Sequence, residues 1–254
     1  EKKALMSKKC QELKMINKTI VALDNMSFKE AKVFLDKADG IKLIKIGMEM
    51  FYAMGKKSVL ELSEQYNVKV FLDLKLHDIP NTVANAIKSL QGLPIEFLTI
   101  HAVGGREMIN AAMMAKQEFL PDTNILGVSF LTSLSEDHFK EILNIEVDSI
   151  SNAFKRVFLA GLNENIDGFI LSGHELSLLN KLCKSENKQT LKICPGIRFK
   201  EEILSGNVQD QKRVMDPKRA FDSGADYIVM GRSLTNAIDL NSRLEELKKT
   251  SVVN

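Results

Sequence analysis

The chain has 254 residues, 44% hydrophobic and 27% charged, which is typical of one large globular domain and excludes a disordered or low-complexity chain. Its 35 Lys and Arg nearly balance its 33 Asp and Glu, so no bulk positive charge favours nucleic acid or a membrane surface. No apolar run reaches the ~20 residues that cross a bilayer, and the first residues lack the apolar core of a signal peptide.

Short apolar, β-branched runs alternate with amphipathic helical stretches along the chain. The runs predict eight strands, at Thr19–Asp24, Ile41–Gly47, Val68–Lys75, Glu96–Ala102, Asn124–Thr132, Ile166–Ser172, Lys192–Ile197 and Tyr227–Gly231. Helix starts are predicted at Ser27, Asn81, Ser135-Glu136 and Asp216-Pro217. Continuously apolar strands indicate a parallel sheet covered on both faces. Eight strand–helix units favour the α/β class and a closed (β/α)8 TIM barrel over an open doubly wound sheet, whose Gly-rich first turn is missing.

The chain divides into an N-terminal extension, residues 1–18, and a single barrel domain, residues 19–254. In the extension, Leu5, Leu13 and Ile16 would form an apolar stripe on a short helix that caps the bottom of the barrel or frays. The segment Phe199–Val214 is the longest polar stretch between a strand and the next helix. It is either a mobile lid or an exposed loop.

Cysteine and histidine spacing bears on redox state and on metal binding. The three cysteines, Cys10, Cys183 and Cys194, are odd in number and far apart, which favours reduced thiols in a cytoplasmic protein. The four histidines show no paired ligand spacing, so we expect no zinc site. No cofactor motif is visible either.

The most informative segment is the end of the third predicted strand. Asp73 and Lys75 are two residues apart, so on an extended strand they point the same way, and Asp78 follows where the strand ends. A charged pair that faces a barrel interior must be paired or is strongly destabilised. The pair is therefore either a catalytic site or a structural salt bridge.

Other polar residues stand where the remaining strands end, which is where TIM barrels carry their chemistry. They are Asp24, Lys45, His101, Thr132, Ser133, Arg198, Gly231 and Arg232. Two Gly-rich turns follow strands seven and eight, Pro195-Gly196-Ile197-Arg198 and Gly231-Arg232-Ser233. Glycine lets backbone N–H groups approach an anion and arginine donates two hydrogen bonds at once, so these turns predict a phosphate site.

Each of these residues also has a structural interpretation. Asp24 could belong to a helix N-cap region and Lys45 could extend out of the barrel end. The remaining alternatives are His101 as a satisfied core histidine, His77 facing away from the pair by strand alternation, Thr132 beginning a turn, and Arg198 and Arg232 as solvated surface charges.

The segment Asp73-Leu-Lys75-Leu-His-Asp78-Ile79-Pro-Asn-Thr82 resembles the Asp-x-Lys-x-x-Asp-Ile-x-x-Thr signature of the orotidine 5′-phosphate decarboxylase family, in its bacterial form. The resemblance covers nearly the whole chain except the N-terminal extension. Its other blocks are, in order, Ile20-Val-Ala-Leu-Asp24, Lys45-Ile-Gly-Met-Glu49, His101-Ala-Val-Gly-Gly105, Leu131-Thr132-Ser133, Pro195-Gly-Ile-Arg198, Asp210-Gln211-Lys-Arg213 and Gly231-Arg232-Ser233.

The resemblance implies a cofactor-independent, metal-free enzyme that converts orotidine 5′-phosphate to uridine 5′-phosphate and CO2, the last step of pyrimidine nucleotide synthesis. Lys75 would protonate C6 of the pyrimidine and Asp73 would lie against the substrate carboxylate. Asp24 and Lys45 would bind the ribose hydroxyls, with Lys45 also part of the charged network. Thr132 would contact the pyrimidine.

The resemblance also implies a phosphate site and a homodimer. Arg198, Gln211, Gly231 and Arg232 would surround the phosphate, and Gln209 and Arg213 are alternatives to Gln211. Asp78, Ile79 and Thr82 would reach the neighbouring subunit's site.

Two rival functions remain at this level. One is a metal-dependent sugar-phosphate decarboxylase or aldolase of the same barrel superfamily, which the Leu131-Thr132-Ser133 block and Arg198 disfavour. The other is a non-catalytic nucleotide-binding scaffold, which the intact set of Asp73, Lys75 and Asp78 disfavours.

Overall fold

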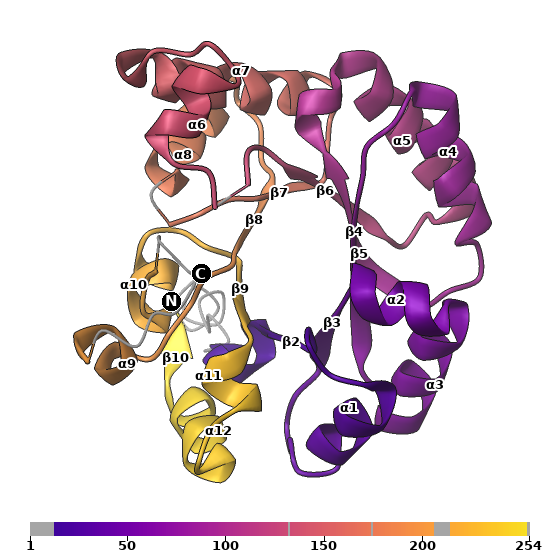
Figure 1. Ribbon diagram of the computed structural model, residues 1–254, viewed down its shortest axis with the longest axis vertical. Helices are drawn as coiled ribbons and strands as arrows, with labels where there is room; N and C mark the ends of the chain where they lie inside the picture. The colour runs from indigo at the N-terminus through magenta and orange to yellow at the C-terminus, as the bar shows by residue number, and fades with distance from the viewer. Residues whose placement is uncertain (1–12, 132, 174, 206–213, 253–254) are drawn as a thin grey trace, which may run out of the picture.

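The computed structural model describes residues 13–131, 133–173, 175–205 and 214–252, and its centre is a closed barrel of eight parallel strands (Figure 1). The predicted (β/α)8 class is therefore confirmed. The barrel strands are β2 (Thr19–Ala22), β3 (Leu43–Gly47), β4 (Lys69–Leu76), β5 (Ile95–His101), β6 (Asn124–Val128), β7 (Gly168–Ile170), β8 (Leu191–Cys194) and β9 (Tyr227–Met230). Pairing of β2 with β9 closes the ring.

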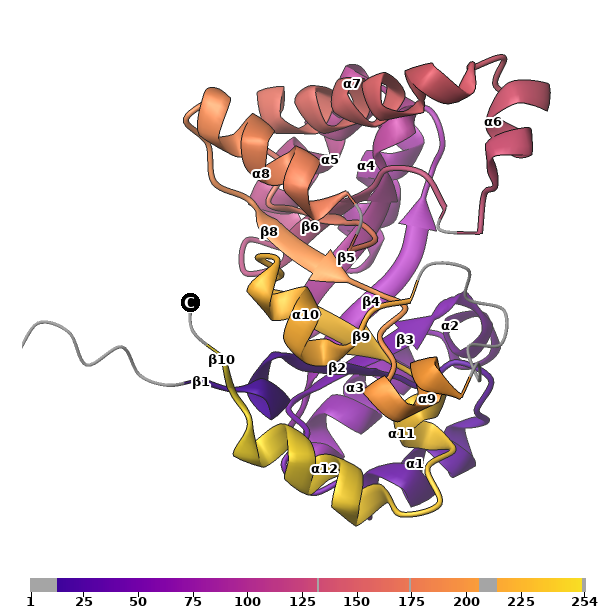
Figure 2. The same ribbon diagram turned by 90° about the vertical axis from the view of Figure 1, so that its left-hand side faces the viewer.

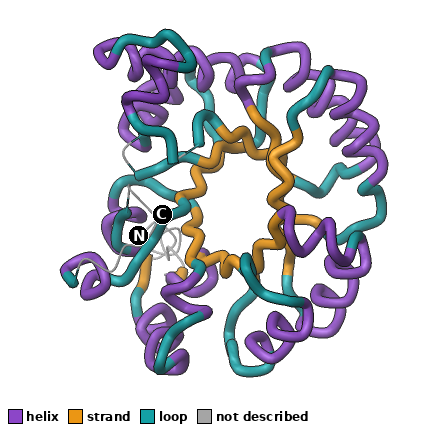
Figure 3. Tube along the Cα trace, viewed as in Figure 1, coloured by secondary structure: helices purple, strands orange, loops and turns teal. Residues whose placement is uncertain are grey.

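Helices surround the ring of strands on its outer side (Figure 3). They are α1 (Phe28–Leu35), α2 (Met48–Met54), α3 (Lys56–Tyr66), α4 (Pro80–Ser89), α5 (Arg106–Phe119), α6 (Glu136–Glu141), α7 (Ile150–Asn163), α8 (Leu176–Ser185), α9 (Lys200–Leu204), α10 (Pro217–Asp222), α11 (Arg232–Thr235) and α12 (Leu240–Lys249). Short 3-10 turns are η1 (Met15–Lys18), η2 (Ala102–Gly104) and η3 (Val147–Ser149). Three of the four predicted helix starts match: Ser27, Ser135 and Asp216 are N-caps, whereas α4 begins at Pro80 rather than Asn81.

Two apolar layers follow from strand alternation. Side chains that point outward from the strands pack with the helices in one large buried cluster. Side chains that point inward form a smaller cluster that fills the barrel: Ile20, Ala22, Leu43, Phe71, Phe97, Leu126, Ile193 and Val229. Phe71 and Phe97 are register partners on β4 and β5, and their rings meet edge to face with centroids 6.0 Å apart. The barrel interior is thus a packed apolar core, and it supports the side chains at the carboxyl ends of the strands.

The first and last strands of the described chain lie side by side, outside the ring of barrel strands (Figure 2). β1 (Leu13–Lys14) pairs antiparallel with β10 (Ser251–Val252), and η1 follows β1 with Met15 and Ile16 buried. The short helix expected here is therefore wrong for residues 13–14, which form a strand; Leu5 lies outside the described residues. This pairing holds residues 13–14 and 251–252 next to each other.

The segment expected to be one polar loop, 199–214, contains a helix in its described part. Phe199 is fully buried and α9 follows it directly, so the expectation is wrong for residues 199–204. The guanidinium of Arg243 on α12 lies over the Phe199 ring, 4.2 Å from its centroid, and pairs with Glu201. Residues 206–213, where the lid interpretation falls, lie outside the described ranges.

Two thiols in the described part of the chain, Cys183 and Cys194, are buried and form no disulfide. Burial raises the pKa of Cys194 to about 12, which keeps this thiol protonated at neutral pH. Cys10 falls outside the described residues. None of the helices in the described ranges has the length and hydrophobicity of a membrane-spanning segment.

Candidate active site

Four charged side chains form a continuous row at the carboxyl ends of the first three barrel strands. The ammonium of Lys45 lies 2.8 Å and 2.6 Å from the two carboxylate oxygens of Asp24, and 3.2 Å from Oδ2 of Asp73. The ammonium of Lys75 lies 2.8 Å from each carboxylate oxygen of Asp73. We call Asp24, Lys45, Asp73 and Lys75 the charged row; its charges alternate in sign and sum to zero.

Strand alternation places the row. Asp73 follows Phe71 by two residues on β4, so it continues the inward-facing side of the strand one step beyond the packed barrel core. Lys45 on β3 also faces the barrel interior. It stands two residues after Leu43, which belongs to the inward cluster, and it is the register partner of Phe71. Asp24 follows the end of β2, whereas Lys45 and Asp73 lie within the last residues of β3 and β4.

Gly47 gives the row room on its Asp24 side. A Cβ atom at Gly47 would come within 2.5 Å of Oδ1 of Asp24, closer than side chains tolerate. The φ angle of Gly47 is −85°, which any residue adopts, so glycine is required here for space rather than for backbone conformation.

The two central members of the row are shielded from water, which strengthens the electrostatic interaction between them, whereas Asp24 is exposed. Asp73 is 8% exposed and Lys45 also 8% exposed. Burial acts to raise the pKa of Asp73, but the charges of Lys45 and Lys75 and two hydrogen bonds outweigh it, so this pKa lies below its ordinary value. Burial likewise acts to lower the pKa of Lys45, but Asp73 and Asp24 outweigh it and this pKa is raised. Both groups are therefore charged at neutral pH.

These contacts decide between the interpretations left open by the sequence. Ser27, not Asp24, caps α1, and the carboxylate of Asp24 is engaged with Lys45. The Lys45 side chain points to two carboxylates rather than out of the barrel end. Arg198 is 5% exposed, so its interpretation as a solvated surface charge is wrong.

The strand that carries Lys75 is not regularly extended at that residue. The φ angle of Lys75 is +48°, and pairing of β4 with β5 shifts register between Leu72 and Leu76. The alternation argument therefore stops being valid at Lys75, although its conclusion that the two charges meet is correct. It also cannot place His77 on the opposite side: the His77 ring lies 5.2 Å from the ring of His101, centroid to centroid.

His101 is half-buried at the end of β5 and lies near the row. Burial, then the neighbouring His77 and Lys75, lower its pKa, which favours the neutral imidazole at neutral pH. A neutral histidine beside Lys75 adds no positive charge to compete with the ammonium. His101 is only half-buried, so it is not the core histidine that one interpretation of the sequence expected.

One buried side chain in direct contact with the row was missed by the sequence interpretation. Thr99 on β5 is fully buried, and its hydroxyl binds both the carboxylate of Asp73 and the backbone N–H of Lys75. The available signal was its spacing: Thr99 stands two residues after Phe97, as Asp73 stands two residues after Phe71.

A cavity of about 180 Å³ lies between two members of the row and both Gly-rich turns. Asp24 and Lys45 line it together with Gly196, Arg198 and Arg232. Gly231, also predicted for this site, is in the lining as well. The cavity therefore brings together the predicted sugar-binding residues and four predicted or neighbouring residues of the phosphate site.

Some predicted residues lie apart from the row or outside the described chain. Asp78 and Thr82 are exposed, as is Ile79 at 67%, and Asp78 accepts a hydrogen bond from the N–H of Ile79 rather than joining its own chain's row. Thr132, Gln209, Gln211 and Arg213 lie outside the described residues.

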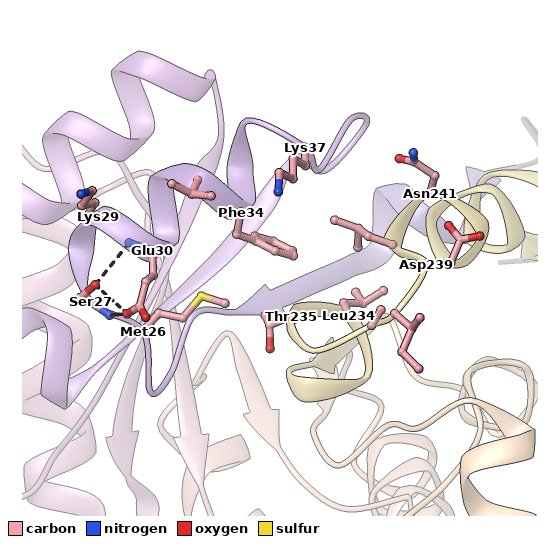
Figure 4. A pocket seen from close by; sticks show the side chains of 14 residues that line it. Met26, Ser27, Lys29, Glu30, Phe34, Lys37, Leu234, Thr235, Asp239 and Asn241 are labelled. Atoms are coloured by element: carbon pink, nitrogen blue, oxygen red, sulfur yellow. Dashed lines mark hydrogen bonds between the residues drawn. The ribbon is translucent and has the colours of Figure 1, made fainter.

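A larger cavity, of about 950 Å³, lies outside the barrel between α1 and the segment 234–241 (Figure 4). Phe34 and Leu234 project into it, and at its edge Ser27 and Glu30 bond each other to cap α1. Both carboxylates near it are committed to helix caps, since Asp239 caps α12. Its volume exceeds that of the barrel cavity, but no charged row faces it, so the barrel mouth is the better candidate for catalysis.

Comparison with known proteins shows the family of the chain. Residues 17–247 match the model of the family described as "Orotidine 5′-phosphate decarboxylase / HUMPS family". The chain belongs to this family. Because the match begins before β2 and ends within α12, it includes every strand of the barrel.

Individual relatives support the same membership. Orotidine 5′-phosphate decarboxylase of Carboxydothermus hydrogenoformans is 39% identical over 230 residues, which cover 88% of this chain and 91% of that protein. The enzyme of the same name from Streptococcus thermophilus is 38% identical over 238 residues, 91% of this chain and 96% of that protein. The crystal structure of orotidine 5′-phosphate decarboxylase from Lactobacillus acidophilus has a TM-score of 0.76 and 32% identity, and covers 92% of this chain and 98% of its own.

Proposed function

We propose that this protein decarboxylates orotidine 5′-phosphate to uridine 5′-phosphate and CO2, the reaction that completes uridine nucleotide synthesis. The single observation that carries the proposal is the charged row, which stands at the barrel mouth beside a cavity lined by Arg198 and Arg232. Membership of the decarboxylase family supports it. In a bound nucleoside monophosphate, the phosphate would lie at the two arginines and the ribose at Asp24 and Lys45. The base would lie at Asp73 and Lys75.

The chemistry follows from the charges. The bond between C6 and the carboxylate breaks, CO2 leaves, and the electron pair stays on C6 in the plane of the ring. We assign the next step to Lys75, whose ammonium stabilises this pair and then gives it a proton, which forms the new C6–H bond. Lys75 regains its proton from water.

Asp73 has two tasks in this scheme. It holds the ammonium of Lys75 in place through two hydrogen bonds. It also repels the substrate carboxylate: two like charges ~4 Å apart at an effective dielectric constant near 20 interact by roughly 4 kcal/mol. Since enzymes lower barriers by ~8–23 kcal/mol, repulsion alone is insufficient, and stabilisation of the C6 electron pair supplies the larger share.

The remaining roles are assigned along the cavity. Asp24 and Lys45 bind the ribose hydroxyls, and Lys45 also keeps Asp73 ionised. Arg198, Gly231 and Arg232, together with Gln211, hold the phosphate. Thr132 contacts the pyrimidine. Binding at the phosphate, far from C6, contributes energy that orders the charges around the base.

We further propose that the enzyme is a cytoplasmic homodimer in which Asp78, Ile79 and Thr82 complete the site of the other subunit. Two observations support this part. Asp78 forms no ion pair with any described residue of its own chain, although it follows directly on the strand that carries the row. Met48 and Tyr52 on α2, Ile79 after β4 and Val103 on η2 expose large apolar side chains, and an association surface would cover them.

The metal-dependent alternative is less well supported. Within the described ranges, no three His, Cys, Asp or Glu side chains are grouped as metal ligands. Both carboxylates of the row, the buried Asp73 and the exposed Asp24, bind ammonium groups instead. The relatives described above carry the name of the decarboxylase.

The first experiment follows the absorbance loss of orotidine 5′-phosphate with the purified protein, with and without a chelator. We expect turnover in both conditions. The variant Lys75→Ala should lose activity by at least about 1,000-fold, because no other group is placed to protonate C6. Circular dichroism should show that it remains folded. Near-normal turnover by Lys75→Ala would refute the role of Lys75, and wild-type turnover that disappears with chelator would favour the metal-dependent alternative.

A further inference from the structure

The hydroxyl of Thr99 links two residues of the row, Asp73 and Lys75, to the neighbouring strand. Its oxygen lies 2.9 Å from the backbone nitrogen of Lys75 and 2.9 Å from Oδ1 of Asp73. The side chain is fully buried, so water does not compete for either bond. It belongs to β5, whereas both partners belong to β4.

The direction of these hydrogen bonds is unambiguous. The N–H of Lys75 can only donate, so the hydroxyl oxygen accepts there. The single hydroxyl hydrogen is then left for Asp73, whose pKa is lowered and whose carboxylate therefore accepts. Thr99 thus orders one donor and one acceptor at once, which neither valine nor alanine can do.

The bond to Lys75 stabilises an unusual backbone. With φ at +48°, Lys75 is in the left-handed region, which is unfavourable for a non-glycine residue. Between the register pairs Leu72–Leu98 and Leu76–Ile100, β4 advances four residues while β5 advances two. In this bulge the N–H of Lys75 finds a side-chain hydroxyl instead of a strand carbonyl. Bulges redirect side chains, and this one determines where the Lys75 ammonium points.

We propose that Thr99 is a positioning residue for decarboxylation: its hydroxyl fixes the Asp73 carboxylate and the bulged backbone of Lys75 relative to each other. The inference rests on the proposed function, and it assigns to β5 a part in aiming the proton donor. Thr99 acts through Asp73 and Lys75 and does not itself exchange a proton with the substrate.

The test compares Thr99→Val, which keeps the shape and removes the hydroxyl, with Thr99→Ser, which keeps the hydroxyl. We expect Thr99→Val to lower kcat by about 10- to 100-fold with KM changed less than about threefold, because ground-state binding of ribose and phosphate is untouched. Thr99→Ser should stay within about threefold of the wild-type kcat. If Thr99→Val does not fold, Thr99→Cys, with a weak donor and acceptor in similar volume, takes its place with the same expectation.

A matched control separates positioning from loss of a buried hydrogen bond. Thr123 is also buried, and its hydroxyl donates to the carbonyl of Ile95 at the opposite end of β5, 2.8 Å away. Both Thr123→Val and Thr99→Val should lower the midpoint of unfolding. Only Thr99→Val should also lower kcat, and Thr123→Val should leave it unchanged. An equal kcat loss in Thr123→Val would reduce the role of Thr99 to general stability.

The pH profile provides a second readout. Asp73 is faced by Lys45 from β3, by Lys75 from β4 and by Thr99 and His101 from β5. Because the hydroxyl is one of the groups that lower the pKa of Asp73, its removal should shift the acid limb of kcat to higher pH. Activity would then be lost earlier as pH falls.

Outcomes distinguish the inference from the function on which it rests. No turnover by the wild type would refute the proposed function. Wild-type turnover together with an unchanged kcat in Thr99→Val, or with equal losses in Thr99→Ser and Thr99→Val, would refute the role of Thr99 alone.

Discussion

At the scale of single residues, the candidate site depends on space as much as on charge. The carboxylate of Asp24 can approach Lys45 closely because Gly47, on the same strand as Lys45, has no side chain. Each charge in the row is stabilised by an opposite neighbour, which is what allows Lys45 and Asp73 to stay ionised while buried.

Gly47→Ala tests the requirement for space. The added methyl group would lie within 2.5 Å of Oδ1 of Asp24 and force that carboxylate away from Lys45. We expect KM for orotidine 5′-phosphate to rise about 10-fold and kcat to fall less, because Asp24 is assigned to ribose binding rather than to C6. Steady-state kinetics would reveal this, and an unchanged KM would show that Asp24 can be displaced without consequence.

At the scale of elements, packing overrides local preference where helices cover the barrel. α7 contains a buried Gly161, although glycine weakens a helix by roughly 1 kcal/mol relative to alanine. The reason is the ring of Phe169 on β7: a Cβ at Gly161 would lie 2.5 Å from its Cζ. Helix and strand therefore approach closely enough that only glycine fits.

Gly161→Ala should consequently destabilise the protein, opposite in sign to what helix propensity predicts. Overpacking at a buried ring costs about 1–3 kcal/mol, which exceeds the gain of about 1 kcal/mol from propensity. Urea unfolding followed by circular dichroism measures the difference. A higher midpoint for the variant would mean that the ring moves aside without strain.

At the scale of the whole molecule, each subunit carries its own charged row, and we propose that residues of the other subunit complete the site. Asp78 and Ile79 are exposed on the loop that follows β4, and Thr82 lies in the first turn of α4. If these residues complete the other subunit's site, then neither subunit is active alone, and activity depends on association.

Mixing two inactive variants tests this arrangement. Lys75→Ala and Asp78→Asn dimers, exchanged to equilibrium, should recover about a quarter of wild-type activity, because half of the dimers are hybrid and each hybrid contains one intact site. Subunit exchange is verified with differently tagged chains. Persistent inactivity despite proven exchange would contradict the sharing of sites.

Local patterns along the chain are enough to predict the barrel and to single out the charged residues near the strand ends. Alternation of apolar strands with amphipathic helices indicates eight parallel strands, and period-two alternation within β4 carries Asp73 inward, since both patterns are local in the chain. A charge at a strand end can be recognised without knowing its partner.

The way in which those charges meet depends on contacts between strands, which local patterns do not reveal. The left-handed turn at Lys75, its support by Thr99 from another strand and the room that Gly47 leaves for Asp24 all depend on contacts between strands. The same holds for the burial of Arg198 and for β1 pairing with β10 instead of forming a helix. Such contacts join residues far apart in the chain, and the energy that stabilises a bulge or a buried charge comes from neighbours that local periodicity does not identify.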